Sequence, residues 1–242
     1  MNPATLGQAK ELFVEIRNSL RKYEDIEIAV APPIPYLSDL AKLSPSGRIA
    51  LMAQDAWYEN TGPETGLVSV PMVKSSGASY VLVGHSEMRA RGETDEVIVK
   101  KLQAIHKAKL TPVLCVGESV RDAEGKFYSV VQNQLTTALA NCTQAALTRI
   151  VIAYEPVWAI GSGETPSEYD IQEMRLFIEK VIVELFSRKI ANKVRILYGG
   201  SVSHHNAETL FSECEVDGFL VGGASLKTHS FSAIAKAIRN KK

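Results

Sequence analysis

The stretch of sequence that decides the fold runs from Ile150 to Ser167 and reads IVIAYEPVWAIGSGETPS. It opens with a short apolar run, Ile150 to Ala153, that consists mostly of β-branched residues. Such a run is typical of a strand that is buried on both faces. Glu155 follows, and Pro156 ends the strand because proline has no N–H to donate to a sheet ladder. The stretch therefore predicts a buried strand with a carboxylate at its carboxyl end.

The rest of the same stretch predicts a loop and then a helix. Residues 157–160 are Val-Trp-Ala-Ile, and residues 161–163 are Gly-Ser-Gly. An apolar loop between a proline and glycines has the composition of a lid that folds over a small ligand and excludes water. A helix start follows, with Thr165 as the N-cap, Pro166 at the first helical position and Glu168 completing a capping box.

Glu155 is a candidate general base. An ionisable side chain at the carboxyl end of a buried strand, beneath a loop that can close, has the position that proton transfer requires. The alternative is a solvated loop residue or the partner of an ion pair, and that alternative stays open. The apolar Trp158 in the following loop favours the general base, because an apolar side chain in a loop is expected to pack over other groups, such as a bound ligand.

The remainder of the chain alternates between short apolar runs and amphipathic segments. The other predicted strands are 26–31, 49–53, 80–84, 111–116, 194–198 and 218–221. The predicted helices are 6–22, 35–42, 95–109, 128–141, 167–188, 204–213 and 231–240. This alternation indicates parallel βαβ units, and 242 residues suit one (β/α)₈ barrel, which has about 250. We expect an α/β fold with a single barrel domain over residues 1–242, seven strands instead of eight, and a long functional loop at 54–69.

Composition excludes several other classes of protein. The chain has 27 basic and 27 acidic residues and no basic block among aromatic residues, which argues against a nucleic-acid partner. No apolar run is long enough to span a membrane, and no signal pattern opens the chain. The three cysteines, Cys115, Cys142 and Cys214, have no metal-binding spacing. An odd number of cysteines argues against a disulfide framework and fits the reducing cytoplasm.

Residue types that carry chemistry follow the predicted strands at their carboxyl ends. They are His85, Glu87, Glu155, Ser201, Gly222 and Gly223. All strand carboxyl ends of a parallel barrel lie on one face, which is where active sites of such barrels lie. The loops 199–201 (Gly-Gly-Ser) and 222–223 (Gly-Gly) follow the last two strands, where backbone N–H groups commonly hold a phosphate. A glycine pair alone also fits a simple tight turn.

Several motifs resemble those of the triosephosphate isomerase family. Residues 153–161 (AYEPVWAIG) are similar to the segment with the family's base and lid, and residues 84–87 (GHSE) to the segment with its histidine. Further similar motifs are AQ at 53–54, GETDE at 92–96, CVGE at 115–118, YGGS at 198–201 and DGFLVGGASL at 217–226. The resemblance implies a (β/α)₈ barrel that interconverts dihydroxyacetone phosphate and D-glyceraldehyde 3-phosphate through an enediolate, with no metal and no cofactor.

The resemblance also implies roles for individual residues. Glu155 would be the base, and His85 would polarise the substrate carbonyl as a neutral imidazole. A helix N-terminus would keep the pKa of His85 low, and this family is itself the standard example of such tuning. The residues implied to bind substrate are Gly161, Ser201, Gly222 and Gly223. Glu87 and Cys115 would support the site from behind, although Cys115 is equally a small core residue.

The largest departure from the family is at the start of the sequence. The family begins with a strand that ends in an asparagine and a substrate-binding lysine, and here Met1-Asn2-Pro3 resembles only the residues after that lysine. We expect roughly a dozen further residues upstream, which mass spectrometry of the native N-terminus tests. Without them the first and last strands would be open edges, and folding and activity would be poor. The alternatives are a non-catalytic paralogue that binds phosphate or a partner, and another phosphate-sugar barrel enzyme.

A second departure concerns the subunit interface that the resemblance implies. The family is typically a homodimer, with the loop 54–69 reaching into the partner. Leu67 and Met88 stand where the family usually has an acid and an arginine, which we interpret as an ion pair across the interface. Because losing both charges together replaces the ion pair by an apolar contact, we expect Leu67 and Met88 to pack together in the dimer.

Overall fold

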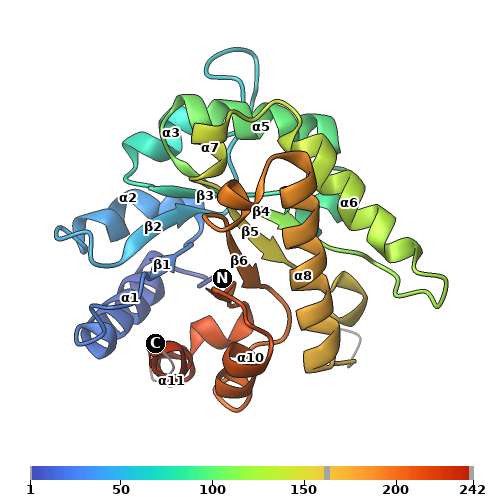
Figure 1. Cartoon of the computed structure of the whole chain (residues 1–242). Helices are drawn as coiled ribbons and strands as arrows, with labels where there is room; N and C mark the ends of the chain where they lie inside the picture. The colour runs from blue at the N-terminus through green and yellow to red at the C-terminus, as the bar shows by residue number, and fades with distance from the viewer. Residues whose placement is uncertain (1, 161–163, 240–242) are drawn as a thin grey trace.

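The computed structural model describes residues 2–160 and 164–239. Within them, seven parallel strands form one sheet in chain order. These strands are β1 (Ala29–Val30), β2 (Ala50–Ala53), β3 (Tyr80–Val83), β4 (Thr111–Val116), β5 (Val151–Tyr154), β6 (Arg195–Tyr198) and β7 (Gly218–Phe219). The sheet curls around an axis and the helices lie outside it (Figure 1). The predicted α/β class and the seven parallel strands of a (β/α)₈ barrel are confirmed.

The helices fill the connections between the strands. The longer ones are α1 (Leu6–Leu20), α2 (Ile34–Lys42), α5 (Asp95–Lys107), α6 (Lys126–Leu139), α8 (Glu168–Leu185), α10 (Ala207–Glu213) and α11 (Thr228–Arg239). All of these were predicted. The shorter ones are α3 (Val70–Ser75), α4 (Ser86–Ala90), α7 (Gln144–Leu147), α9 (Arg188–Ala191), η1 (Val157–Ala159) and η2 (Gly223–Leu226). They were not predicted, because fewer than two turns give no amphipathic period to read.

The predicted start of α8 is wrong by two residues. The N-cap is Ser167, not Thr165, and α8 begins at Glu168, after Pro166. The Ser167 hydroxyl accepts from the N–H of Asp170 at 3.2 Å, and the Asp170 carboxylate accepts from the N–H of Ser167 at 2.9 Å. This capping box satisfies two backbone donors at once, which explains why it decides where the helix begins.

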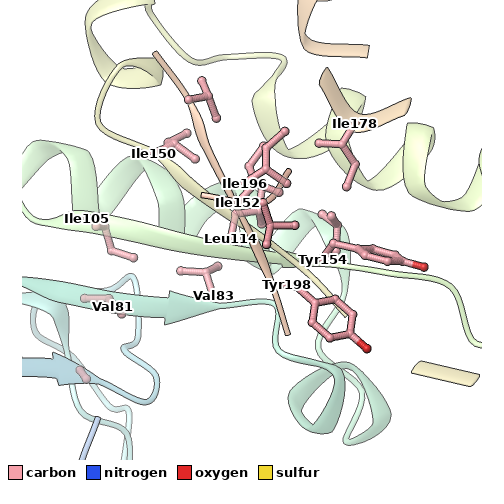
Figure 2. Packing of buried hydrophobic residues seen from close by; sticks show 14 of the residues in the cluster. Val81, Val83, Ile105, Leu114, Ile150, Ile152, Tyr154, Ile178, Ile196 and Tyr198 are labelled. Carbon is pink, nitrogen blue, oxygen red and sulfur yellow. The ribbon is translucent and has the colours of Figure 1, made fainter. Parts of the chain in front are cut away.

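Strand β5 is buried on both faces, as predicted for the decisive stretch, and the central strands β2, β3 and β4 are buried at all positions except the first. Their outward side chains pack against the helices, and Figure 2 shows Val81, Val83, Leu114, Ile152 and Tyr154 in this outer core. The inward side chains form a second, smaller core of Met52, Leu82, Val113, Cys115, Val151 and Ala153. Successive side chains of a strand alternate between faces. Glu155, two residues after Ala153, therefore points inward at the rim.

The sheet has two open edges. The strand order runs from β1 to β7, and in the part of the chain that the structure describes these two strands do not pair with each other. The predicted open edges are therefore confirmed. A cavity of about 1310 Å³ opens at the rim and continues into the space between the edges, where Phe13, Ile16 and Ile234 line it.

The loop 54–69 projects beyond the helices between β2 and α3 (Figure 1). The Trp57 and Tyr58 rings lie against each other at its base with centroids 4.3 Å apart. Leu67 precedes Val68, whose carbonyl accepts from the N–H of Trp57 at 2.8 Å, and is 46% exposed. An exposed apolar side chain on a projecting arm suits a contact with another molecule. Within the described residues, no helix is both long and apolar enough to cross a membrane.

Candidate active site

The Glu155 carboxylate lies at the inner rim and is almost completely buried. Only 2% of the residue is exposed. One oxygen, Oε2, accepts from the backbone N–H of Ser86 at 2.9 Å, and this N–H is the first of helix α4. The other oxygen, Oε1, lies 3.0 Å from Nε2 of His85. Because a buried charge needs hydrogen-bond partners, these two contacts explain how a carboxylate is kept in this position, ready to accept a proton.

His85 joins β3 to α4 and is the N-cap of that helix. Its Nδ1 accepts from the backbone N–H of Glu87 at 3.3 Å. In a neutral imidazole, one nitrogen accepts and the other carries the proton. The hydrogen bond from the N–H of Glu87 therefore favours the tautomer with the proton on Nε2, which contacts the Glu155 carboxylate directly. The structure thus brings His85 and Glu155 together from loops after β3 and β5.

The prediction that the pKa of His85 is held low is wrong for this arrangement. The hydrogen bond to Glu155 raises the pKa of His85 above its ordinary value of 6.5, and burial opposes this only in part. The N-terminus of α4 does contact the ring, as expected, through the N–H of Glu87. The direct contact with a carboxylate outweighs it, because an opposite charge within hydrogen-bond distance favours the charged form.

This contact makes a testable prediction about pH. Because the folded-state pKa of His85 is raised, protonated His85 stabilises the fold below the unfolded value of 6.5. This contribution is lost as the pH rises through the folded pKa. We expect the unfolding free energy, from urea titrations between about pH 6 and about pH 8, to fall more steeply in the wild type than in His85→Gln. Histidine-ring NMR measures the pKa directly, and a His85 midpoint at or below 6.5 would contradict the prediction.

The predicted phosphate loops open onto the same cavity. Ser201, Gly222 and Gly223 all line it together with His85 and Glu155. A Cβ added at Gly222 or Gly223 would meet no protein atom within 4 Å, so both glycines face open space that a ligand can occupy. The carbonyl of Ser201 accepts from Nδ2 of Asn206 at 2.9 Å, which fixes that loop. Gly161, also predicted here, lies outside the described residues.

The two residues expected to support the site, Glu87 and Cys115, differ in how they meet it. The Glu87 side chain is exposed, and its contact with His85 is made by the backbone N–H. Cys115 lies in the inner core and is completely buried, and burial raises the pKa of its thiol well above the ordinary value. A thiol in that state stays neutral, so Cys115 contributes shape and not charge.

Sequence reasoning missed the role of a second buried carboxylate, Glu118. Its Oε1 accepts from the hydroxyl of Tyr154 and the indole N–H of Trp158, both at 2.9 Å. Burial raises the pKa of Glu118. These contacts tie the start of the predicted lid to the ends of β4 and β5. The signal was available, because Glu118 follows a buried strand in the same way as Glu155.

A close backbone contact beneath Glu155 was also missed. A Cβ added to Gly117 would lie 1.7 Å from the carbonyl oxygen of Glu155, so only glycine fits there. The Gln134 side chain pairs with both polar groups of Gly117, accepting from its N–H at 2.9 Å and donating to its carbonyl at 3.1 Å. A turn residue packed in this way holds the backbone of Glu155 in place.

Comparison with known proteins agrees with this geometry. A family model described as triosephosphate isomerase matches residues 1–238. The relative of that name from Carboxydothermus hydrogenoformans is 45% identical over 224 residues, which is 92% of this chain and 89% of the relative. The one from Geobacter metallireducens is 42% identical over 94% of this chain and 92% of its own length. The one from a Roseiflexus species is 45% identical over 95% and 91%. The resemblance seen in the motifs is confirmed, and this chain belongs to the triosephosphate isomerase family.

Proposed function

We propose that this chain interconverts dihydroxyacetone phosphate and D-glyceraldehyde 3-phosphate. The observation that carries the proposal is the pairing of His85 with Glu155 at 3.0 Å in a cavity that Gly222 and Gly223 also line. A general base beside a hydrogen-bond donor suits proton transfer next to a carbonyl group. Glycine loops at the same rim suit the phosphate of a small substrate.

The chemistry follows from these atoms. The Glu155 carboxylate takes a proton from the carbon next to the carbonyl, and the C–H electron pair becomes the double bond of an enediolate. Nε2–H of His85 donates a hydrogen bond to the oxygen on which negative charge develops. His85 gives its Nε2 proton to this oxygen and takes a proton back from the hydroxyl group on the carbon that was deprotonated, whose oxygen becomes the new carbonyl. Glu155 returns its proton to the carbon that carried the old carbonyl, which gives the other isomer. Substrate inserted between the two side chains would break their direct contact, and with it the cause of the raised pKa of His85.

The other predicted site residues belong to this proposal. Backbone N–H groups of Gly222 and Gly223, together with the loop at Ser201, hold the phosphate group, and Gly161 adds a contact from the lid. Closure of the lid, 157–163, excludes water and holds back elimination of phosphate. Glu87 and Cys115 support His85 and Glu155 from behind. The chain folds as one barrel domain and works in the cytoplasm, in glycolysis and gluconeogenesis.

A coupled assay of isomerisation in both directions tests the proposal. We expect turnover that 2-phosphoglycolate inhibits by competition, because this anion resembles the enediolate in charge and size. Binding of 2-phosphoglycolate without any turnover would instead support a phosphate-binding protein that is not a catalyst. If the chain shows no turnover and does not bind 2-phosphoglycolate, the proposal is overturned.

The projecting loop supports a further part of the proposal, a homodimer. Loop 54–69 stands away from the body of the subunit (Figure 1), and Leu67 on this loop is exposed. Met88 lies in α4, three residues after His85. An apolar contact between Leu67 of one subunit and Met88 of the other would place the dimer interface beside the site.

This contact is a testable prediction. In a double variant, Leu67→Cys with Met88→Cys, we expect mild oxidation to link two chains, because packed side chains lie within the distance that a disulfide can span. Non-reducing electrophoresis detects the link. The control pairs Met88→Cys with Val120→Cys, an exposed position in another loop. A monomer in size-exclusion chromatography, or equal cross-linking in both variants, would contradict the prediction.

A further inference from the structure

Gly84 connects β3 to His85, and charged side chains hold both of its backbone polar groups. Its N–H donates to Oε2 of Glu93 at 3.1 Å, and its carbonyl accepts from Nε of Arg89 at 3.0 Å. Gly84 has a φ of 70°, in the left-handed region that glycine enters at little cost. Because glycine also enters other regions easily, the backbone before His85 needs these two bonds to fix it.

Glu93 is in turn held by a buried lysine on α5. Lys101 is only 2% exposed, and its ammonium group contacts the carboxylate of Glu93, whose side chain is 4% exposed. The same ammonium group lies 2.6 Å from Oδ1 of Asp55, at the start of loop 54–69. A buried ammonium group without partners would be strongly destabilising. The burial of Lys101 therefore depends on both carboxylates, one of which reaches the backbone next to His85.

On the other side of Gly84, Arg89 is fixed in the same way. Its Nη1 lies 2.7 Å from Oδ1 of Asp95, and its side chain is mostly buried. The charged groups thus form one chain from Asp55 through Lys101 and Glu93 to the N–H of Gly84. A second branch runs from the carbonyl of Gly84 through Arg89 to Asp95. Among the described residues, no hydrogen bond or ion pair joins these side chains to the side chains of His85 and Glu155.

We infer that Glu93, Lys101 and Arg89 are positioning residues for His85, which they hold by fixing the backbone of Gly84. This inference rests on the proposed function, in which Nε2 of His85 must meet a substrate oxygen. Rotation at Gly84 would move the imidazole ring away from Glu155. A displacement of about 1 Å at a reacting group costs on the order of a hundredfold in rate. A buried ion network that served only stability would have no reason to end on both polar groups of this one residue.

Glu93→Ala tests the inference, because it removes the acceptor for the N–H of Gly84. We expect kcat to fall about tenfold to a hundredfold, with KM changed by less than about threefold. Glu93→Gln keeps an oxygen that can accept the same bond and should restore most of kcat. The control is Ile105→Ala. Ile105 is fully buried and lies one turn after Lys101 in α5, but it takes no part in the charged chain from Asp55 to Gly84. This change should lower the melting temperature while leaving kcat per folded molecule unchanged.

A readout without substrate separates this inference from the proposed function. In ¹⁵N spectra of the histidine rings, Glu93→Ala should shift or broaden the signals of His85 and leave those of His204 and His205 unchanged. If the wild type has no isomerase activity, the proposed function fails, and these spectra still test the positioning of His85. Arg89→Met, which frees the carbonyl of Gly84, is the second variant if Glu93→Ala does not fold, with the same losses expected. Wild-type kcat and wild-type His85 signals in a folded Glu93→Ala or Arg89→Met variant would overturn the inference.

Discussion

Replacing Glu155 with glutamine is expected to lower kcat/KM for the isomerisation by about 10²–10⁴-fold, the usual contribution of a positioned general base. Glutamine has nearly the same shape and can still accept the N–H of Ser86, which Glu155 accepts at 2.9 Å. It cannot take a proton from carbon. The loss should therefore appear in the rate while the fold persists.

Two companion variants define this expectation. Glu155→Asp keeps the charge but withdraws the carboxylate by one methylene, so it should retain activity between that of the wild type and that of Glu155→Gln. Glu208→Gln, an exposed change on α10, is the matched control for loss of a carboxylate and should leave the rate unchanged. A coupled assay measures all three, with circular dichroism to confirm folding. Activity of Glu155→Gln within about threefold of wild type would show that another group is the base.

Replacing Gly117 with alanine is expected to have the largest effect on stability, a loss of about 3 kcal/mol or more. The new Cβ would lie 1.7 Å from the carbonyl oxygen of Glu155, so one of the two backbones must move. Movement at Gly117 would break its two bonds with Gln134, and movement at Glu155 would displace the base. The same change should therefore lower kcat by about a hundredfold in the molecules that still fold.

Urea unfolding followed by circular dichroism measures this loss. Gly7→Ala is the matched control, because Gly7 lies in helix α1, where the nearest atom to an added Cβ is 3.9 Å away. That change should be neutral or stabilising by up to about 1 kcal/mol. If Gly117→Ala were as stable as Gly7→Ala, the close contact with Glu155 could not be present in the folded protein.

The sequence predicted the parts of this molecule that depend on local patterns. The apolar run at Thr111–Val116 and the decisive stretch both became strands, because short β-branched runs between glycines and prolines favour buried parallel strands. In a parallel barrel, the carboxyl ends of all strands lie on one face. The topology alone therefore predicted that His85, Glu155 and the glycine loops would lie on one rim.

The parts that could not be predicted depend on partners far apart in the sequence. A lysine in the middle of an amphipathic helix normally indicates a solvent-exposed position, because lysine is almost never fully buried unless it is paired. Lys101 is instead buried, because it contacts Asp55. These two residues are 46 positions apart in the sequence, so no local pattern connects them. The pKa of His85 was predicted in the wrong direction for the same kind of reason. The motif at residues 84–87 predicts the helix terminus next to His85. Only the folded structure shows that the His85 ring lies within hydrogen-bond distance of Glu155.

The hydrogen bond between Trp158 and Glu118 also provides an optical probe. The chain has two tryptophans, and the other, Trp57, lies beside Tyr58 at the base of the projecting loop. In Trp57→Phe, all indole fluorescence would come from a ring whose N–H bonds a buried carboxylate at 2.9 Å. Any event that breaks this bond changes the emission of that ring, so movement at the start of the lid could be followed by stopped-flow spectroscopy without a label.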